Sequence, residues 1–196
     1  MSNRISEIID RINQLEGELE KEIAKRHALM EAKFLALGEG IKNMHQKAKV
    51  GALRYLFNAN LLVILTVPVI YSLIFAFVLL DIMVSFYQAI CFPIYKIEKV
   101  KRKNYMSFDR HKLSYLNMIE KMNCLYCSYG NGVIAYAREV AARTEKYWCP
   151  IKHSLRIHGV HKYYRSFEDY GDGDEYQEKL LEHQDELKGK GGKKTD

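Results

Sequence analysis

Apolar side chains recur at intervals of three and four positions in the first part of the chain, which predicts an amphipathic helix over residues 1 to about 37. The repeating positions share one helical face: Ile5, Ile8, Ile12, Leu15 and Leu19. A second stripe follows out of register, at Met30, Phe34, Leu37, Ile41 and Met44. Such a face either packs within its own chain or pairs with a second copy, so a coiled-coil homo-oligomer through this helix is one expectation.

The interval from residue 55 to residue 95 is almost entirely apolar, and Asp81 is its one normally charged side chain. The run LLVILTVPVIYSLIFAFVLL alone is long enough to cross a hydrocarbon layer of roughly 30 Å. As one helix the interval would be about 60 Å long, twice that thickness. The length therefore predicts a bend or turn, giving a transmembrane or re-entrant helical hairpin.

Basic residues flank the apolar interval on both sides. Upstream are Lys42, Lys47, Lys49 and Arg54, and downstream are Lys96, Lys99, Lys101, Arg102 and Lys103. Because basic flanks stay cytoplasmic, both termini are expected on that side. Asp81 is then the turn residue at the far interface, and the alternative is a functional carboxylate within the membrane, as a proton or ion site.

Residues 96–170 predict a small helical cytoplasmic domain that contains three of the four cysteines. LSYLNMIEKMN has the pattern of a short amphipathic helix, NCLYCSYGNG that of a loop, and GVIAYAREVAARTEKYW that of a second helix capped by Asn131. After an irregular stretch, DEYQEKLLEHQDELK is a polar helix candidate before a disordered basic tail. The fold is therefore expected to be mainly α, with segments 1–54, 55–95, 96–170 and 171–196.

The cysteines and one histidine form the main candidate for chemistry. CLYC and CPIKH supply Cys124, Cys127, Cys149 and His153, a ligand set that zinc accepts in tetrahedral sites. An iron-sulfur centre would instead use Cys91 as the fourth thiolate. An unbroken helix between the two pairs would hold them about 25 Å apart, so a shared metal needs that helix to be short or broken. The alternative is a set of buried structural thiols.

Cys149 has a second interpretation, as the N-cap of a helix that begins at Pro150. The positive end of that helix would lower the pKa of the thiol, and His153 one turn later would serve as a base. The sequence identifies no oxyanion hole or third orienting group, so whether the protein is an enzyme stays open.

The net charge of +6 comes mostly from residues beside the apolar interval, where anionic lipid head groups attract cations. Membrane lipid is therefore the expected partner, and nucleic acid is not expected. The strings YQAICFPIY, YLNMIEKMNCLYCSYGNG and REVAARTEKYWCPIKH resemble an uncharacterised family of bacterial membrane proteins over about residues 60 to 172. The resemblance implies a bacterial inner-membrane location and supplies no activity or catalytic residue.

Two functions follow from these patterns. The first is a membrane-anchored factor that binds zinc or an iron-sulfur cluster and serves the assembly or redox upkeep of other membrane components. The alternative is a non-enzymatic, oligomeric membrane scaffold whose cysteines are structural. Other membrane proteins are expected partners in both.

Overall fold

The structure is a computed structural model that describes residues 2–36 and 60–188. Within these ranges the chain is mainly helical and has no β-strand, which confirms the predicted fold class at that level. It divides into two compact units, residues 1–50 with 114–117 and residues 51–113 with 118–196.

The first unit contains α1 (Ser2–Ala36), a continuous helix that confirms the first predicted element. Six of its apolar side chains are between 46% and 65% exposed: Ile8, Leu15, Leu19, Ile23, Leu29 and Met30. Leu37, Ile41 and Met44 of the second predicted stripe lie outside the described residues. The described part of the chain thus leaves the apolar positions of α1 open to a partner, and self-association stays a prediction.

The second unit begins with α4 (Leu61–Tyr95), which is one helix of 35 residues. The side chain of Asn60 caps its first turn by accepting a hydrogen bond of 3.0 Å from the Leu62 backbone N–H. The helix ends at Lys96, which has the left-handed φ of 60° typical of a helix C-terminus. By length and composition its stretch Ile64–Tyr95 could cross a membrane.

The predicted hairpin is wrong for residues 61–95, because α4 continues through Asp81 without a turn. The residues around Asp81 are helix-compatible apolar side chains with no glycine, and Asp81 is ion-paired within the protein. Its carboxylate therefore does not need water at a membrane surface. Residues 55–59 of the predicted hairpin lie outside the described ranges.

α5 (Met118–Trp148) is also one helix, although the sequence predicted a loop at NCLYCSYGNG followed by a second helix. Asn131 does not cap a helix; its side-chain N–H donates to the Cys127 carbonyl within α5. The loop prediction relied on two glycines that lie within α5, at positions where a larger side chain has no room. A Cβ at Gly132 would lie 2.8 Å from the Tyr105 carbonyl oxygen, and one at Gly130 would lie 2.7 Å from the Phe77 ring.

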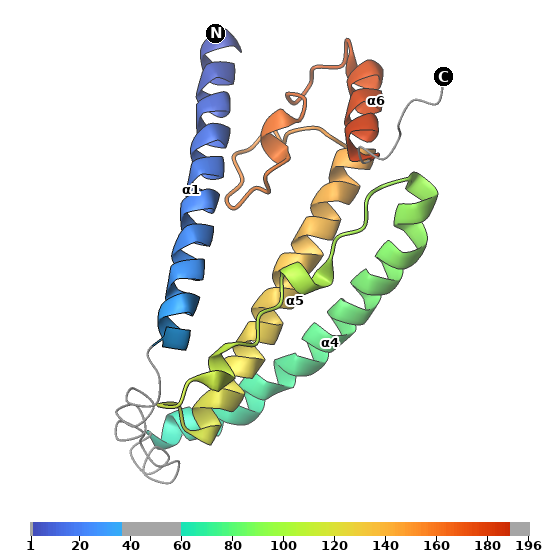
Figure 1. Cartoon of the computed structure of the whole chain (residues 1–196). Helices are drawn as coiled ribbons and strands as arrows, with labels where there is room; N and C mark the ends of the chain where they lie inside the picture. Colours follow the sequence, from blue (N-terminus) through green and yellow to red (C-terminus); the bar gives the residue numbers. More distant parts are fainter. Residues whose placement is uncertain (1, 37–59, 189–196) are drawn as a thin grey trace. The chain divides into compact units, whose positions relative to one another are not determined.

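α4 and α5 lie side by side and run in the same direction (Figure 1). Their contacts keep an almost constant offset along the chain, from Tyr71 with Tyr126 to Tyr95 with Tyr147. Residues 96–113, called the return segment below, lead from the end of α4 back toward the start of α5 and include η1 (Arg102–Asn104) and η2 (Arg110–Lys112). The shared core consists of Phe92, Ile97, Val100, Tyr136, Val140 and Leu187.

Residues 149–175 are irregular, as predicted, apart from η3 (Tyr164–Ser166) and one parallel bridge between Ile151 and Glu168. The predicted polar helix is confirmed as α6 (Tyr176–Leu187). It packs on the C-terminal end of α5, where the Gln184 side chain donates to the Tyr147 carbonyl at 3.1 Å. Leu187 enters the shared core, so α6 belongs to the same folded unit.

Candidate functional site: the two faces of α4

The inward face of α4 carries a carboxylate that is fully engaged. Asp81 is only 8% exposed, and Arg102 of the return segment donates to both of its oxygens, with Nε to Oδ1 at 2.9 Å and Nη2 to Oδ2 at 2.6 Å. Tyr129 of α5 donates its hydroxyl to Oδ2 at 3.0 Å. Such bidentate pairs are strong and directional. Asp81 therefore joins α4 to both of its neighbours, and the predicted turn role is wrong.

Gln88, two turns further along the same face, makes three hydrogen bonds while only 7% exposed. Its Oε1 accepts from the Val100 backbone N–H at 2.6 Å, and its Nε2 donates to the Val100 carbonyl at 3.2 Å. Nε2 also donates to the Tyr136 hydroxyl at 3.1 Å. One side chain thus satisfies both backbone groups of a return-segment residue and ties them to α5.

The sequence contained a signal for this face that the prediction missed. Asp81, Ser85 and Gln88 are spaced by four and three positions, which places them on one side of a helix. Ser85 lies 3.5 Å from the Tyr136 hydroxyl, and Tyr87 lies 3.2 Å from Thr144. A polar stripe within an apolar helix indicates a face that packs on protein.

The outward face of α4 is apolar and uncovered. Its members recur at helical spacing, and their side chains are between 46% and 77% exposed: Phe75, Leu79, Ile82, Met83, Phe86, Ile90 and Ile94. These seven residues are called the outward face below. A contiguous exposed patch of this kind marks a membrane or protein contact.

The predicted metal ligands are not brought together. Because α5 is unbroken, Cys127 and Cys149 are about 33 Å apart along the helix axis, whereas ligands of one zinc lie within about 4 Å of each other. Cys91 lies on α4 and Cys124 near the start of α5. Among the described residues, no three His, Cys, Asp or Glu side chains form a group suited to a metal ion.

The predicted nucleophile arrangement at Cys149 is wrong. No helix begins at Pro150; instead the Cys149 backbone N–H donates to the Glu145 carbonyl at 2.8 Å and closes the end of α5. Cys149 therefore lies at a helix C-terminus and not at the positive N-terminal end of a helix that the interpretation required. His153 stacks on Tyr164, with ring centroids 6.1 Å apart.

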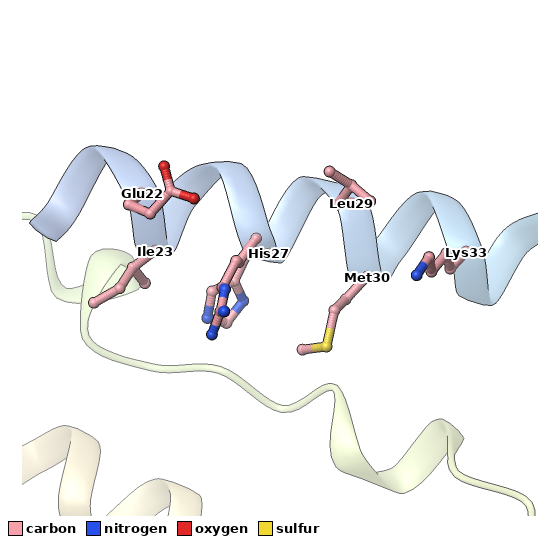
Figure 2. Close-up of a pocket in the computed structure, with 7 residues that line it drawn as sticks. Glu22, Ile23, His27, Leu29, Met30 and Lys33 are labelled. Carbon is pink, nitrogen blue, oxygen red and sulfur yellow. The ribbon is translucent and has the colours of Figure 1, made fainter.

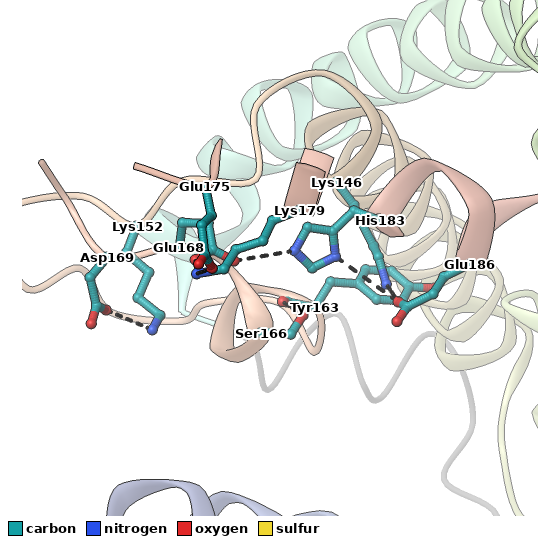
Figure 3. A network of polar contacts seen from close by, with 10 residues as sticks. All are labelled: Lys146, Lys152, Tyr163, Ser166, Glu168, Asp169, Glu175, Lys179, His183 and Glu186. Carbon is teal, nitrogen blue, oxygen red and sulfur yellow. Dashed lines mark hydrogen bonds and ion pairs between the residues drawn. The ribbon is translucent and has the colours of Figure 1, made fainter. Parts of the chain in front are cut away.

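A second concentration of polar groups joins α5, α6 and the loop between them (Figure 3). Lys179 of α6 pairs with Glu168 at 2.6 Å, and Lys146 of α5 pairs with Glu186. His183 lies between Glu168 and Glu186, 4.0 Å from each, and is 7% exposed. Burial, assisted by the nearby Lys146 charge, lowers the pKa of His183.

Glu139 of α5 anchors the same loop. Burial would raise the pKa of Glu139, but hydrogen bonds from Tyr163, Arg143 and Lys162 outweigh that effect and hold the pKa below its usual value. Their distances to Oε1 are 2.8 Å, 3.0 Å and 3.1 Å respectively. These pairs satisfy one another, as expected of contacts that fix α6 and the loop on α5.

A shallow hollow on α1 is lined by side chains of that helix alone (Figure 2): Glu22, Ile23, Arg26, His27, Leu29, Met30 and Lys33. No wall comes from another element, so the hollow is one face of a helix. It mixes apolar and charged groups, a composition suited to contact with another helix.

Comparison of the chain with protein-family models, curated proteins and solved structures found no match. The resemblance to bacterial membrane proteins stays a prediction. The functional conclusion accordingly rests on the two faces of α4.

Proposed function

We propose that this protein is a non-enzymatic scaffold bound to the cytoplasmic face of the bacterial inner membrane, with both termini cytoplasmic. α4 attaches the folded unit to lipid, and α1 is the surface through which copies or other membrane proteins assemble. The observation that carries the proposal is the contrast between the faces of α4 after Val69, one paired with protein and the other uncovered and apolar.

The outward face is large enough to hold the protein on a membrane. Burying an apolar side chain fully is worth about 2 kcal/mol, and these seven side chains are on average roughly 60% exposed. Covering them would therefore contribute on the order of 8 kcal/mol. The cytoplasmic leaflet is anionic, which suits the exposed lysines of the return segment.

Vesicle flotation tests the attachment. The full chain, mixed with phosphatidylcholine and phosphatidylglycerol vesicles, is expected to float with them. Phe86→Asp places a charge in the outward face and should reduce the floated fraction strongly. Tyr170→Asp is the matched control, because Tyr170 is an equally exposed aromatic residue far along the chain from α4. Equal flotation of both variants would contradict a lipid role for the outward face.

Reporter fusions at the two ends test the sidedness. A reporter active only in the cytoplasm should be active at both ends of the chain, and activity at one end alone would refute the proposed location. The metal-binding function stays a separate prediction. Elemental analysis of the purified protein tests it, and zinc or iron at one atom per chain would favour it over the scaffold.

A further inference from the structure

We propose that α4 does not cross the bilayer but lies in the plane of its cytoplasmic interface, with the outward face submerged and the return segment against anionic lipid head groups. This inference rests on the proposed membrane attachment and specifies its geometry and its lipid chemistry. The length of α4 would permit a membrane crossing, but the protein packed around α4 opposes one.

Protein flanks most of α4. Its contacts with α5 begin at Ile70, whose carbonyl accepts from the Tyr126 hydroxyl at 2.6 Å, and continue to Tyr95, which stacks on Tyr147. The part before these contacts, Leu61–Val69, is about 14 Å long. That is half of the roughly 30 Å that a span requires. A membrane crossing by α4 would therefore carry the flanking elements into the hydrocarbon.

The flanking elements are unsuited to hydrocarbon. The Arg102 side chain is 46% exposed although it pairs with Asp81, so part of the guanidinium faces the surroundings. On α5, Arg138 is exposed and hydrogen-bonded to carbonyls of the irregular loop. Charged groups at membrane depth are costly unless they face a protein interior or water. The folded unit is compatible with a membrane only on one side of α4.

The outward face has the shape that an in-plane helix requires. Phe75, Leu79, Ile82, Phe86 and Ile90 are separated by four or three positions, so they form one continuous stripe along the helix. An interfacial helix normally supplies its own polar face. In this protein, α5 and the return segment pack on the side of α4 away from the outward face and supply the polar groups. The α4 sequence taken alone therefore resembles a membrane span.

The return segment adds a charge preference. Lys96, Lys99, Lys101 and Lys103 are all exposed, and the segment that carries them is held beside α4 by Gln88 and Asp81. A segment beside a half-submerged helix lies at the depth of the head groups. Each lysine near an anionic surface contributes an approximately fivefold gain in binding. The partner surface is therefore a bilayer that contains anionic phospholipid.

Depth-dependent tryptophan quenching tests the orientation. In the full chain carrying Trp148→Phe, which removes the single native tryptophan, tryptophan is introduced separately as Leu79→Trp, Phe86→Trp and Ile94→Trp. The variants are reconstituted into phosphatidylcholine and phosphatidylglycerol vesicles with lipids brominated at different depths. An in-plane α4 gives three depths that agree within about 5 Å. A spanning helix gives a difference of about 22 Å between positions 79 and 94.

Each outcome has a distinct meaning. A depth gradient in floated protein overturns the in-plane arrangement and leaves membrane attachment standing. Floated protein whose tryptophans are not quenched shows that another protein surface, such as a second copy, covers the outward face, and this also overturns the inference. Failure to float refutes the proposed attachment itself.

The charge preference has its own test. Combined replacement Lys99→Gln, Lys101→Gln and Lys103→Gln should reduce binding to vesicles with 30% phosphatidylglycerol by about a hundredfold and leave binding to pure phosphatidylcholine unchanged. Equal loss on both vesicles, or no loss on either, would contradict contact between the return segment and anionic head groups.

Discussion

Gln88→Leu is the sharpest test of the inward face of α4, since leucine keeps approximately the size of the side chain and removes every polar contact. The Val100 backbone N–H loses an acceptor at 2.6 Å, and the Val100 carbonyl and Tyr136 hydroxyl lose a donor. Val100 is 5% exposed, so water cannot readily replace the glutamine.

The size of the effect follows from these contacts. A buried donor left without a partner costs about 1–3 kcal/mol, and each remaining hydrogen bond contributes about 1 kcal/mol. The extra apolar surface of leucine offsets part of this loss. We expect the free energy of unfolding to fall by about 3 kcal/mol, corresponding to more than a hundredfold increase in unfolded population.

Two measurements check this value. Chemical denaturation in mild detergent, followed by circular dichroism, gives the change in unfolding free energy, and hydrogen exchange should show faster exchange of the Val100 amide. Phe86→Ala is the matched control on the outward face, where Phe86 is 63% exposed. It should weaken vesicle binding with little change in stability. Unchanged stability of Gln88→Leu, or equal destabilisation by both variants, would refute the division of α4 into two faces.

Three further predictions concern the packing around α4 and α5. Gly132→Ala should destabilise the protein, because the added Cβ would lie 2.8 Å from the Tyr105 carbonyl oxygen. Gly17→Ala in α1 meets open space and should increase helix stability by up to about 1 kcal/mol. Thermal denaturation checks both, since the two variants should change the melting temperature in opposite directions. Arg102→Met and Asp81→Asn should each destabilise the protein, and the sum of the two effects should exceed that of the double variant by about 1 kcal/mol, a value that allows for the exposed part of the arginine. Additive effects in this double-mutant cycle would contradict the ion pair. Because the pKa of His183 is lowered in the folded state, its neutral form stabilises the protein above the ordinary pKa of about 6.5, and that stability is lost as the pH falls toward the lower folded value. The urea concentration at the unfolding midpoint should therefore decrease as the pH is lowered from 7.5 to 5.5 in the native chain, and it should change much less in His183→Gln.

The sequence correctly predicted those helices whose formation depends on residues close together in the chain. α1 follows from the spacing of its own apolar side chains, α6 was predicted as a polar helix, and the apolar length of α4 follows from its composition. The hairpin was predicted from the length of the apolar interval and from its two basic flanks, and neither feature reveals that protein packs along one continuous helix α4. The partner of Asp81, Arg102, is 21 positions away, and local patterns do not identify it.

The error at α5 has a different cause. Glycine and asparagine between residues 123 and 132 suggested a loop. At Gly130 and Gly132, however, the helix has no room for a larger residue, because Phe77 and the return segment pack closely against it there. Local propensity was overridden by tertiary packing. From the sequence, a shared metal was possible only if the helix between the two cysteine pairs was short or broken, and α5 is neither.

Comparison of lipid contact on the two sides of one turn of α4 tests the central claim most directly. Phe75 is 77% exposed on the outward face, and Phe77, two positions later, lies against Gly130 and Tyr126 of α5. In vesicles with brominated lipid, and in the Trp148→Phe background, tryptophan at position 75 should be quenched strongly and tryptophan at position 77 weakly, because the in-plane helix places position 75 in the lipid and position 77 against α5. Equal quenching at the two positions would contradict the account, since it would mean that lipid surrounds α4 on all sides.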